Sequence, residues 1–169
     1  MRIYFDNVID SGVKRGDLHP PEELEAARAL DADPSLEAVT SRQSWREQER
    51  TRDDTTRQLL KDARPEVPTV PDDHRVLGMA HYQDRFGGMM SMPLVSDITD
   101  RALYDALVAA GLKTDDAQHL MYAVTNGCER FVTMDTKDIL PIRHQLEPLC
   151  RGLKIARPTE LVAERTNAG

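Results

Sequence analysis

Acidic side chains directly follow two segments that the sequence predicts as strands. Asp6 ends the short apolar segment 2–5, and Asp135 and Asp138 follow the β-branched segment 130–134. Because ligand sites of parallel sheets gather at the carboxyl ends of the strands, we expect these side chains at one common edge. Carboxylate oxygens are the ligands that Mg²⁺ and Mn²⁺ prefer, so the pattern predicts a site for a hard cation.

A predicted helix start brings further carboxylates to the same edge. Thr114 is a good N-cap residue, and Asp115 and Asp116 lie in the first turn, where the helix dipole favours anions. Asn126 and Gly127 end this helix, because both residue types tolerate a left-handed backbone. In a βαβ unit a helix begins where a strand ends, so this first turn also lies beside the predicted cation site. On these residues alone, Asp115 and Asp116 compete for the role of ligand.

Each acidic residue also has a purely structural interpretation. A first-turn Asp can serve only the helix dipole, and Asp138 can cap the helix that follows its turn. Glu47 lies three residues after Ser44, which is the spacing of a capping box, while Ser41 competes as the cap one turn earlier. Asp6 can form an Asx-turn with the residues after it. Taken singly these signals are weak, and the common sheet edge is the stronger argument.

The order of predicted elements defines the fold class. Strands alternate with helices, which predicts an α/β protein with three α/β/α layers and a central, mostly parallel sheet. The 169 residues suit one domain, expected over 1–164, with an insertion or lid around 72–94 and a disordered tail over 165–169. Three local expectations are a loop over 10–20, a polar helix from Ser41 as far as Ala63, and a proline-flanked edge strand over 65–70.

Composition and charge narrow the function classes. The formal net charge is −7, from 29 acidic and 22 basic residues, which argues against non-specific nucleic-acid binding but not against a nuclease. No apolar run reaches membrane-spanning length and the N-terminus lacks the layout of a signal peptide, so we expect a cytoplasmic protein without a membrane partner. Cys128 and Cys150 have no CxxC partner and are expected to be free thiols.

Three arginines at helical spacing form a candidate RNA-binding surface. Arg42, Arg46 and Arg50 follow one another at intervals of four residues, and the planar guanidinium group suits phosphate recognition. The alternative is a solvated helix face whose arginines pair with neighbouring acids. Those neighbouring acids are Glu49, Asp53 and Asp54.

Histidines are ambiguous in this sequence. His119 lies one turn after Asp116, where it is either a packed core histidine or a polar partner of the acidic site. His74 and His81 fall within the expected insertion, and no third ligand of suitable spacing accompanies them. We therefore expect these two as surface or loop residues.

The order of these motifs resembles the PIN domains, a family of metal-dependent ribonucleases that includes the VapC-type toxins. The resemblance covers most of the chain and rests on four motifs. They are IYFDN at 3–7, SRQSWRE at 41–47, Asp-Ala-x-His-Leu at 116–120 and Thr-x-Asp-x-x-Asp at 133–138. The last predicted strand and the Pro-x-Glu-Leu helix, over 153–162, also look like the end of this family.

The resemblance assigns roles to individual residues. It selects Asp116 over Asp115, because the family's aspartate precedes the Ala-x-His-Leu run. The implied catalytic residues are Asp6, Glu47, Asp116 and Asp135. The implied ligands of Mg²⁺ or Mn²⁺ are Asp6, Asp116, Asp135 and Asp138, with Asn7 and Thr133 as supporting residues.

The implied activity is a Mg²⁺- or Mn²⁺-dependent endoribonuclease. Such an enzyme cleaves single-stranded RNA with a metal-activated water and leaves 5′-phosphate and 3′-hydroxyl ends. RNA is then the substrate. A toxin of a toxin–antitoxin pair would also have an antitoxin protein as a partner, and a homodimer is a further expectation that the sequence leaves open.

Three other functions compete with this hypothesis. A PIN-like binding or regulatory module would have weak or no nuclease activity. It is suggested because Asp6 and Asn7 are adjacent, whereas the family usually has one residue between them. A phosphoacceptor receiver domain fits poorly, since it needs an acidic pair after the first strand. Haloacid-dehalogenase-like phosphatases need Asp-x-Asp there, and Asp6-Asn7-Val8 lacks it.

Overall fold

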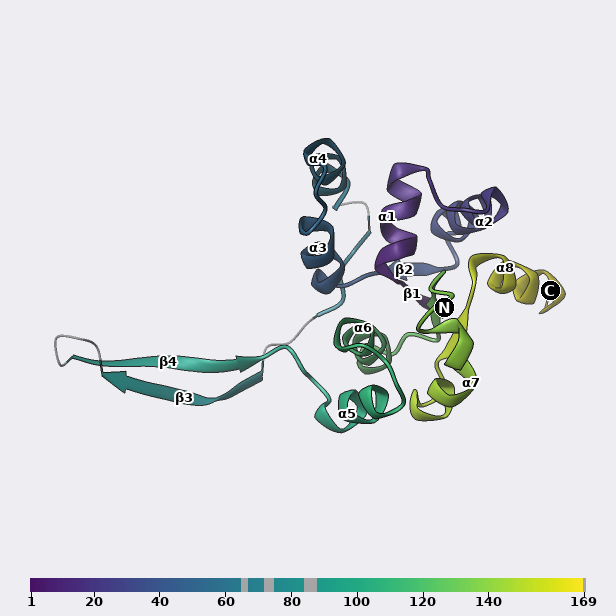
Figure 1. Cartoon of the computed structure of the whole chain (residues 1–169). Helices are drawn as coiled ribbons and strands as arrows, with labels where there is room; N and C mark the ends of the chain where they lie inside the picture. Colours follow the sequence, from purple (N-terminus) through teal and green to yellow (C-terminus); the bar gives the residue numbers. More distant parts are fainter. Residues whose placement is uncertain (65–66, 72–74, 84–87, 169) are drawn as a thin grey trace.

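The computed structural model shows a parallel sheet between two layers of helices (Figure 1). It describes residues 1–64, 67–71, 75–83 and 88–168. The strand order is β2-β1-β5-β6, and every neighbouring pair is parallel. These strands are β1 (Arg2–Phe5), β2 (Glu37–Val39), β5 (Arg130–Val132) and β6 (Lys154–Ala156). The predicted three-layer α/β/α class with a parallel sheet is confirmed.

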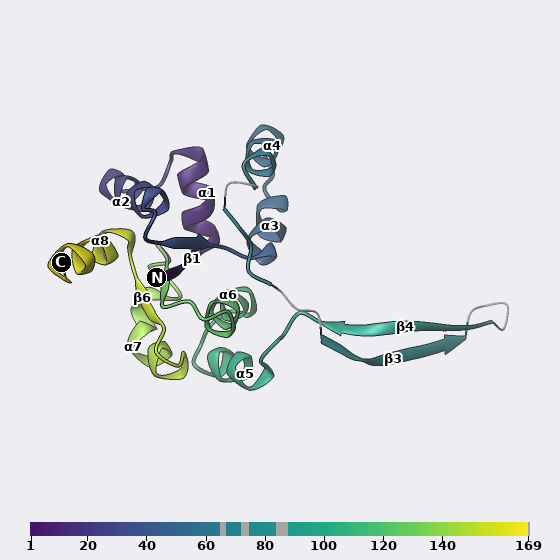
Figure 2. The same cartoon turned by 180° about the vertical axis from the view of Figure 1, so that it is seen from behind.

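Helices cover both faces of this sheet (Figures 1 and 2). One layer holds α1, α2 and α8, the other holds α5, α6 and α7, and α3 and α4 pack against α1. Their bounds are α1 (Asn7–Arg15), α2 (Pro21–Ala32), α3 (Arg42–Glu49), α4 (Asp54–Asp62), α5 (Arg101–Ala109), α6 (Thr114–Thr125), α7 (Arg143–Leu146) and α8 (Pro158–Ala168). Two 3₁₀ turns, Leu140–Ile142 and Glu147–Leu149, flank α7. None of the described helices is long and apolar enough to cross a membrane.

Strand β1 supplies both hydrophobic cores. Ile3 and Phe5 pack into the core beneath α1, α2 and α8, whereas Tyr4 packs into the opposite core, where its ring stacks on Phe131. Successive side chains of a strand point to opposite faces, which explains this division. Phe5 lies opposite Val132 in the β1–β5 register. The register therefore places the residues that follow these two strands side by side.

A two-stranded antiparallel hairpin occupies the segment expected as an insertion or lid around 72–94. Strands β3 (Arg75–Gln83) and β4 (Met89–Ser96) pair along their length, with an irregular register between Val76 and Gly78. In both views the hairpin extends away from the sheet and its helix layers (Figures 1 and 2). The backbone of His81 lies in β3, while His74 lies outside the described residues.

The expected loop over 10–20 is wrong for its first half, because α1 runs from Asn7 to Arg15. Asp6 caps this helix through its side chain, and Gly16 ends it with a left-handed backbone at φ 71°. Gly12 lies so close to Leu18 that an added Cβ would meet the leucine Cδ1 at 2.9 Å. Glycine has a low helix propensity, but at position 12 its lack of a Cβ allows the close contact between α1 and Leu18. The sequence pattern did not reveal this contact.

The single polar helix expected from Ser41 to Ala63 is also wrong. Helix α3 ends at Glu49, and α4 begins at Asp54. Asp53 accepts a hydrogen bond from the backbone N–H of Thr56 and so caps α4, which gives the chain a new helix start inside a polar stretch.

Two shorter expectations also differ from the structure. The edge strand over 65–70 is reduced, within its described residues, to a bridge between Thr40 and Thr69, and residues 65 and 66 lie outside the description. Helix α8 continues to Ala168, past the expected start of a disordered tail at 165, and Arg165 is held by ion pairing with Asp33.

Candidate metal centre

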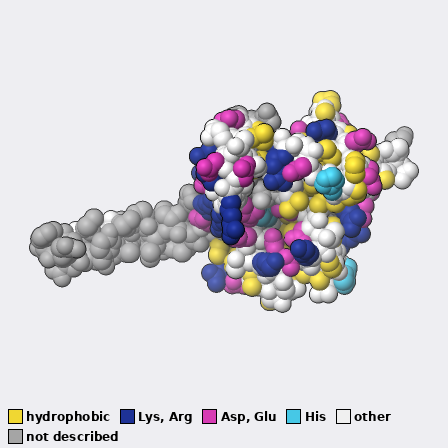
Figure 3. All heavy atoms as spheres, turned by 45° about the horizontal axis from the view of Figure 1, so that its top comes forward, with side chains coloured by type: hydrophobic (Ala, Val, Ile, Leu, Met, Phe, Trp, Pro, Cys, Tyr) yellow, Lys and Arg dark blue, Asp and Glu magenta, His cyan; other side chains and the backbone are white. Residues whose placement is uncertain are grey.

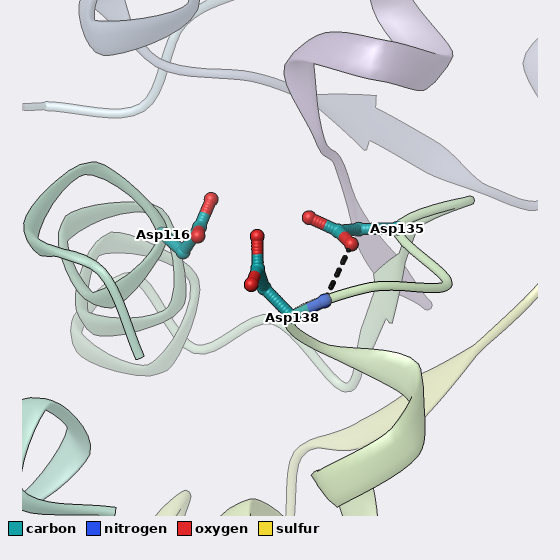
Figure 4. A group of neighbouring side chains, drawn as sticks. All are labelled: Asp116, Asp135 and Asp138. Atoms are coloured by element: carbon teal, nitrogen blue, oxygen red, sulfur yellow. Dashed lines mark hydrogen bonds between the residues drawn. The ribbon is translucent and has the colours of Figure 1, made fainter. Parts of the chain in front are cut away.

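Three aspartates converge at the carboxyl edge of the sheet (Figure 4). Asp116 comes from the first turn of α6, and Asp135 and Asp138 come from the turn after β5. Each offers one carboxylate oxygen, and these oxygens lie within 4.8 Å of one another. Carboxylate oxygens are the ligands that a hard cation such as Mg²⁺ prefers, so these three residues could hold one such ion together.

The turn after β5 is shaped by one of the triad residues. Asp135 Oδ1 accepts hydrogen bonds from the backbone N–H groups of Lys137 and Asp138, both at 2.8 Å. Thr133 Oγ1 in turn accepts the N–H of Asp135 at 3.0 Å. Asp135 therefore holds the turn with one oxygen, which fixes the position of Asp138 beside it (Figure 4).

Asp6, which the resemblance implied as a ligand, is buried and is not a member of this triad. Its Oδ2 accepts the Thr133 hydroxyl at 2.6 Å, and its Oδ1 accepts the backbone N–H of Asn7 at 2.7 Å. Asp6 is 5% exposed, but its charge acts on Asp116. Thr133 thus supports Asp6 as expected. Asn7 contacts Asp6 only through its backbone, and its Oδ1 is buried without a hydrogen-bond partner among the described residues.

A buried chain of hydrogen bonds leads from β1 to Glu47. The Tyr4 hydroxyl lies 2.6 Å from Ser41 Oγ and 2.7 Å from His119 Nδ1. His119 Nε2 donates to Glu47 Oε1 at 3.0 Å. His119 is therefore both a packed core residue and a partner of the site, so the two interpretations of the sequence hold together.

Glu47 is not the capping residue that its spacing from Ser44 allowed. Ser41 occupies the N-cap position of α3 without a side-chain capping bond, because its hydroxyl contacts Tyr4 instead. Glu47 lines the cleft that contains the triad. Its hydrogen bond with His119 fixes it there, while its second oxygen, Oε2, accepts none of the hydrogen bonds recorded for the described residues.

Crowded negative charge changes the proton affinity of the site. Burial, together with the charges of Asp6, Asp135 and Asp138, raises the pKa of Asp116 from 3.8 to about 7. Burial also raises the pKa of Asp6, although the charge of His119 and the hydrogen bond from Thr133 oppose it. Burial is the main cause of both shifts, and at Asp116 the nearby carboxylates add to it, so negative charge at this position is costly.

The pKa of His119 shows the same excess of negative charge. Burial favours the neutral imidazole, but the hydrogen bond with Glu47 and the charges of Asp6, Glu47 and Asp116 outweigh it and raise this pKa. A cation close to these carboxylates is therefore stabilised even in a fully buried position.

The cleft above the triad has a volume of about 680 Å³ and a mixed rim. Two basic residues line it: Arg50 pairs with Asp115 at 2.9 Å, and Lys113 pairs with Asp138 at 2.5 Å. The hydrogen bond with Asp138 and the nearby charges of the triad raise the pKa of Lys113. The exposed face in Figure 3 shows acidic and basic side chains interspersed, without a broad basic surface.

The predicted arginine row reaches the cleft only at one end. Arg50 lines the cleft, whereas Arg46 forms an ion pair with Asp97 at 2.5 Å and Arg42 is exposed on α3 outside the lining. Helix α3 ends at Glu49, so Arg50 follows the helix as its C-cap. The three arginines therefore do not form one continuous surface along the cleft.

Sequence reasoning missed Lys113 and Tyr4 as parts of the site, and it gave Ser41 no role beyond helix capping and its place in the 41–47 motif. Lys113 occupies the N-cap position expected for Thr114, which places its side chain at the cleft. Tyr4 gave no signal, because an aromatic residue in an apolar strand is usually a core residue.

Comparisons with family models, curated protein sequences and solved structures found no match.

Proposed function

We propose that this protein is a Mg²⁺- or Mn²⁺-dependent endoribonuclease of the PIN type. The observation that carries this proposal is the convergence of Asp116, Asp135 and Asp138 in an open cleft, with a pKa of about 7 at Asp116. Crowded carboxylates disfavour the ionised form of Asp116, and a bound divalent cation would stabilise that form.

In this proposal the triad residues hold the cation, and the charge of buried Asp6, which acts on Asp116, adds to theirs. A bound Mg²⁺ or Mn²⁺ would supply Lewis-acid activation of water and stabilise charge on the phosphodiester. Asp135 carries two roles, since its Oδ1 also holds the turn. Because the ligands come from α6 and from the turn after β5, correct folding of both elements is needed to form the site.

Glu47 has the position of a general base. His119 holds Oε1, which leaves Oε2 to accept a proton from the attacking water at the cleft. Attack of that water on phosphorus would expel the 3′-oxygen, which takes a proton from solvent, and would leave a 5′-phosphate and a 3′-hydroxyl end. The role of Tyr4 and His119 is to position Glu47.

Cleavage of single-stranded RNA tests the proposal. Wild-type protein is expected to cleave an unstructured oligonucleotide with Mn²⁺ and to stop when EDTA is added. Asp116→Asn should abolish cleavage, while Asp115→Asn, which changes the neighbouring residue outside the triad, should remain active. Full activity of Asp116→Asn would contradict the assignment.

A regulatory or binding module is the outcome if neither metal binding nor cleavage is detected. The proposal also includes a role as a toxin with an antitoxin partner, and assembly as a homodimer. Co-purification with the product of an adjacent small gene tests the antitoxin, and light scattering tests the dimer.

A further inference from the structure

Lys113 is the basic residue of the cleft that is paired with a member of the triad. Its Nζ lies 2.5 Å from Asp138 Oδ2, and its side chain is 71% exposed. It directly precedes α6, whose first turn carries Asp116. Lys113 is thus anchored beside the candidate metal ligands, while its long side chain keeps access to solvent.

Arg50 provides the internal comparison. It also lines the cleft, its side chain is 65% exposed, and it also pairs with an aspartate. That aspartate is Asp115, which lies outside the triad. The two cations therefore share a surface but differ in whether their acidic partner belongs to the candidate metal site.

We propose that Lys113 binds a phosphate of the RNA strand next to the triad, and that Asp138 holds it in the cleft when RNA is absent. This inference rests on the proposed nuclease function. Exposed ion pairs are weak, so Lys113 can exchange Asp138 for a phosphate without a large loss. Its flexible stem and three donors suit binding of a phosphate as a point charge.

The same contact has a second consequence for the metal-free site. The ammonium group of Lys113 partly neutralises Asp138, and its positive charge repels a divalent cation that approaches the triad. Removal of this charge should therefore strengthen metal binding while it weakens RNA binding. A residue with only a structural role would not change these two affinities in opposite directions.

The experiment compares Lys113→Met with Arg50→Met in the full chain. Calorimetric titration with Mn²⁺, without RNA, should show binding about 3-fold tighter for Lys113→Met and little change for Arg50→Met. Steady-state cleavage of a 5′-labelled oligouridine should show KM raised about 10-fold for Lys113→Met, with a smaller change in kcat. Both side chains are mostly exposed, so both variants should fold, which circular dichroism verifies.

Two results would overturn the inference while the proposed function stands. Either the KM of Lys113→Met stays at the wild-type value, or Lys113→Met binds Mn²⁺ more weakly than wild type. If wild-type protein itself neither binds Mn²⁺ nor cleaves RNA, the proposed function fails, and this inference fails with it.

Discussion

The triad in the cleft and Asp10 on α1 are both acidic, but they are neutralised in different ways. Asp10 is buried with Lys14 at 2.8 Å and accepts a hydrogen bond from Gln48 at 2.7 Å. The side chains of this ion pair are 0% and 3% exposed. The triad contains three carboxylates that lie close to one another and face an open cleft, with one exposed lysine beside Asp138.

This difference separates a carboxylate whose charge is balanced inside the fold from a group of carboxylates whose charge is balanced less completely. A buried carboxylate that serves the fold has its own buried cation and a second donor, so its charge is satisfied within the protein. The triad does not reach that balance, and the pKa of Asp116 rises to about 7. We conclude that charge balance, rather than the presence of acidic residues, distinguishes the candidate metal site from the buried Asp10–Lys14 pair.

The largest expected effect is on catalysis by Asp135→Asn. Asparagine keeps an oxygen that can hold the turn but removes the charge, so cleavage should fall by about 100-fold or more. Cleavage of labelled RNA measures this loss. Asp53→Asn is the matched control, because Asp53 also accepts a backbone N–H but caps α4 outside the cleft. More than a tenth of wild-type activity in Asp135→Asn would show that its charge is not needed.

The next effect concerns stability and involves the other acidic region. Lys14→Met leaves Asp10 as a buried, unpaired charge, so the free energy of unfolding should fall by about 3–5 kcal/mol. Urea unfolding, followed by circular dichroism, measures it. The double variant Asp10→Asn/Lys14→Met should recover much of the loss, because no buried charge remains. Equal stability of Lys14→Met and wild type would contradict the described ion pair.

A smaller effect is expected for the hydrogen-bond chain that holds Glu47. Tyr4→Phe keeps the ring that stacks on Phe131 but removes the hydroxyl between Ser41 and His119. Loss of such a supporting contact should lower the cleavage rate about 10-fold.

The matched control for this chain is Tyr122→Phe. Tyr122 is also buried, and its hydroxyl donates to the Asp97 carbonyl oxygen at 2.7 Å. Cleavage by this control should stay near wild type. An equal loss in both variants would indicate a general effect of a missing buried hydroxyl.

The remaining expected effect is a pH dependence of the metal-free protein. Asp116 has a folded pKa of about 7 against an ordinary value of 3.8, so folding favours its protonated form. Its contribution to stability is therefore present at low pH and is lost as the pH rises towards 7. Urea unfolding in EDTA should show wild type losing stability relative to Asp116→Asn between about pH 4 and about pH 7, with little further change above that range. Parallel pH profiles for the two proteins would contradict the raised pKa.

The sequence pattern predicted the sheet and the acidic edge because both depend on local order along the chain. Alternating strands and helices specify a parallel sheet, and the carboxyl ends of β1 and β5 then place Asp6 and Asp135 at one edge. The break between α3 and α4 was missed, since polar residues such as Asp53 fit both a helix interior and a helix cap.

The hydrogen bonds that join distant segments could not be predicted from the residues. The chain from Ser41 through Tyr4 and His119 to Glu47 joins three distant segments, and no spacing in the sequence encodes it. The sequence also could not predict that Asp6 is not a member of the triad. A strand-end aspartate can face a cleft or cap the next helix, and the N–H of Asn7 and the hydroxyl of Thr133 bind Asp6 in a buried position.

The most direct test of the central claim is a calorimetric titration of the metal-free protein with Mn²⁺ at neutral pH, with Asp116→Asn and Asp115→Asn in parallel. These two variants remove the same charge from adjacent positions, but only Asp116 belongs to the triad. We predict saturable binding for wild type and Asp115→Asn, and a loss of about 100-fold or more in affinity for Asp116→Asn. No binding to wild type, or an equal loss in both variants, would contradict the assignment of the triad as a metal centre.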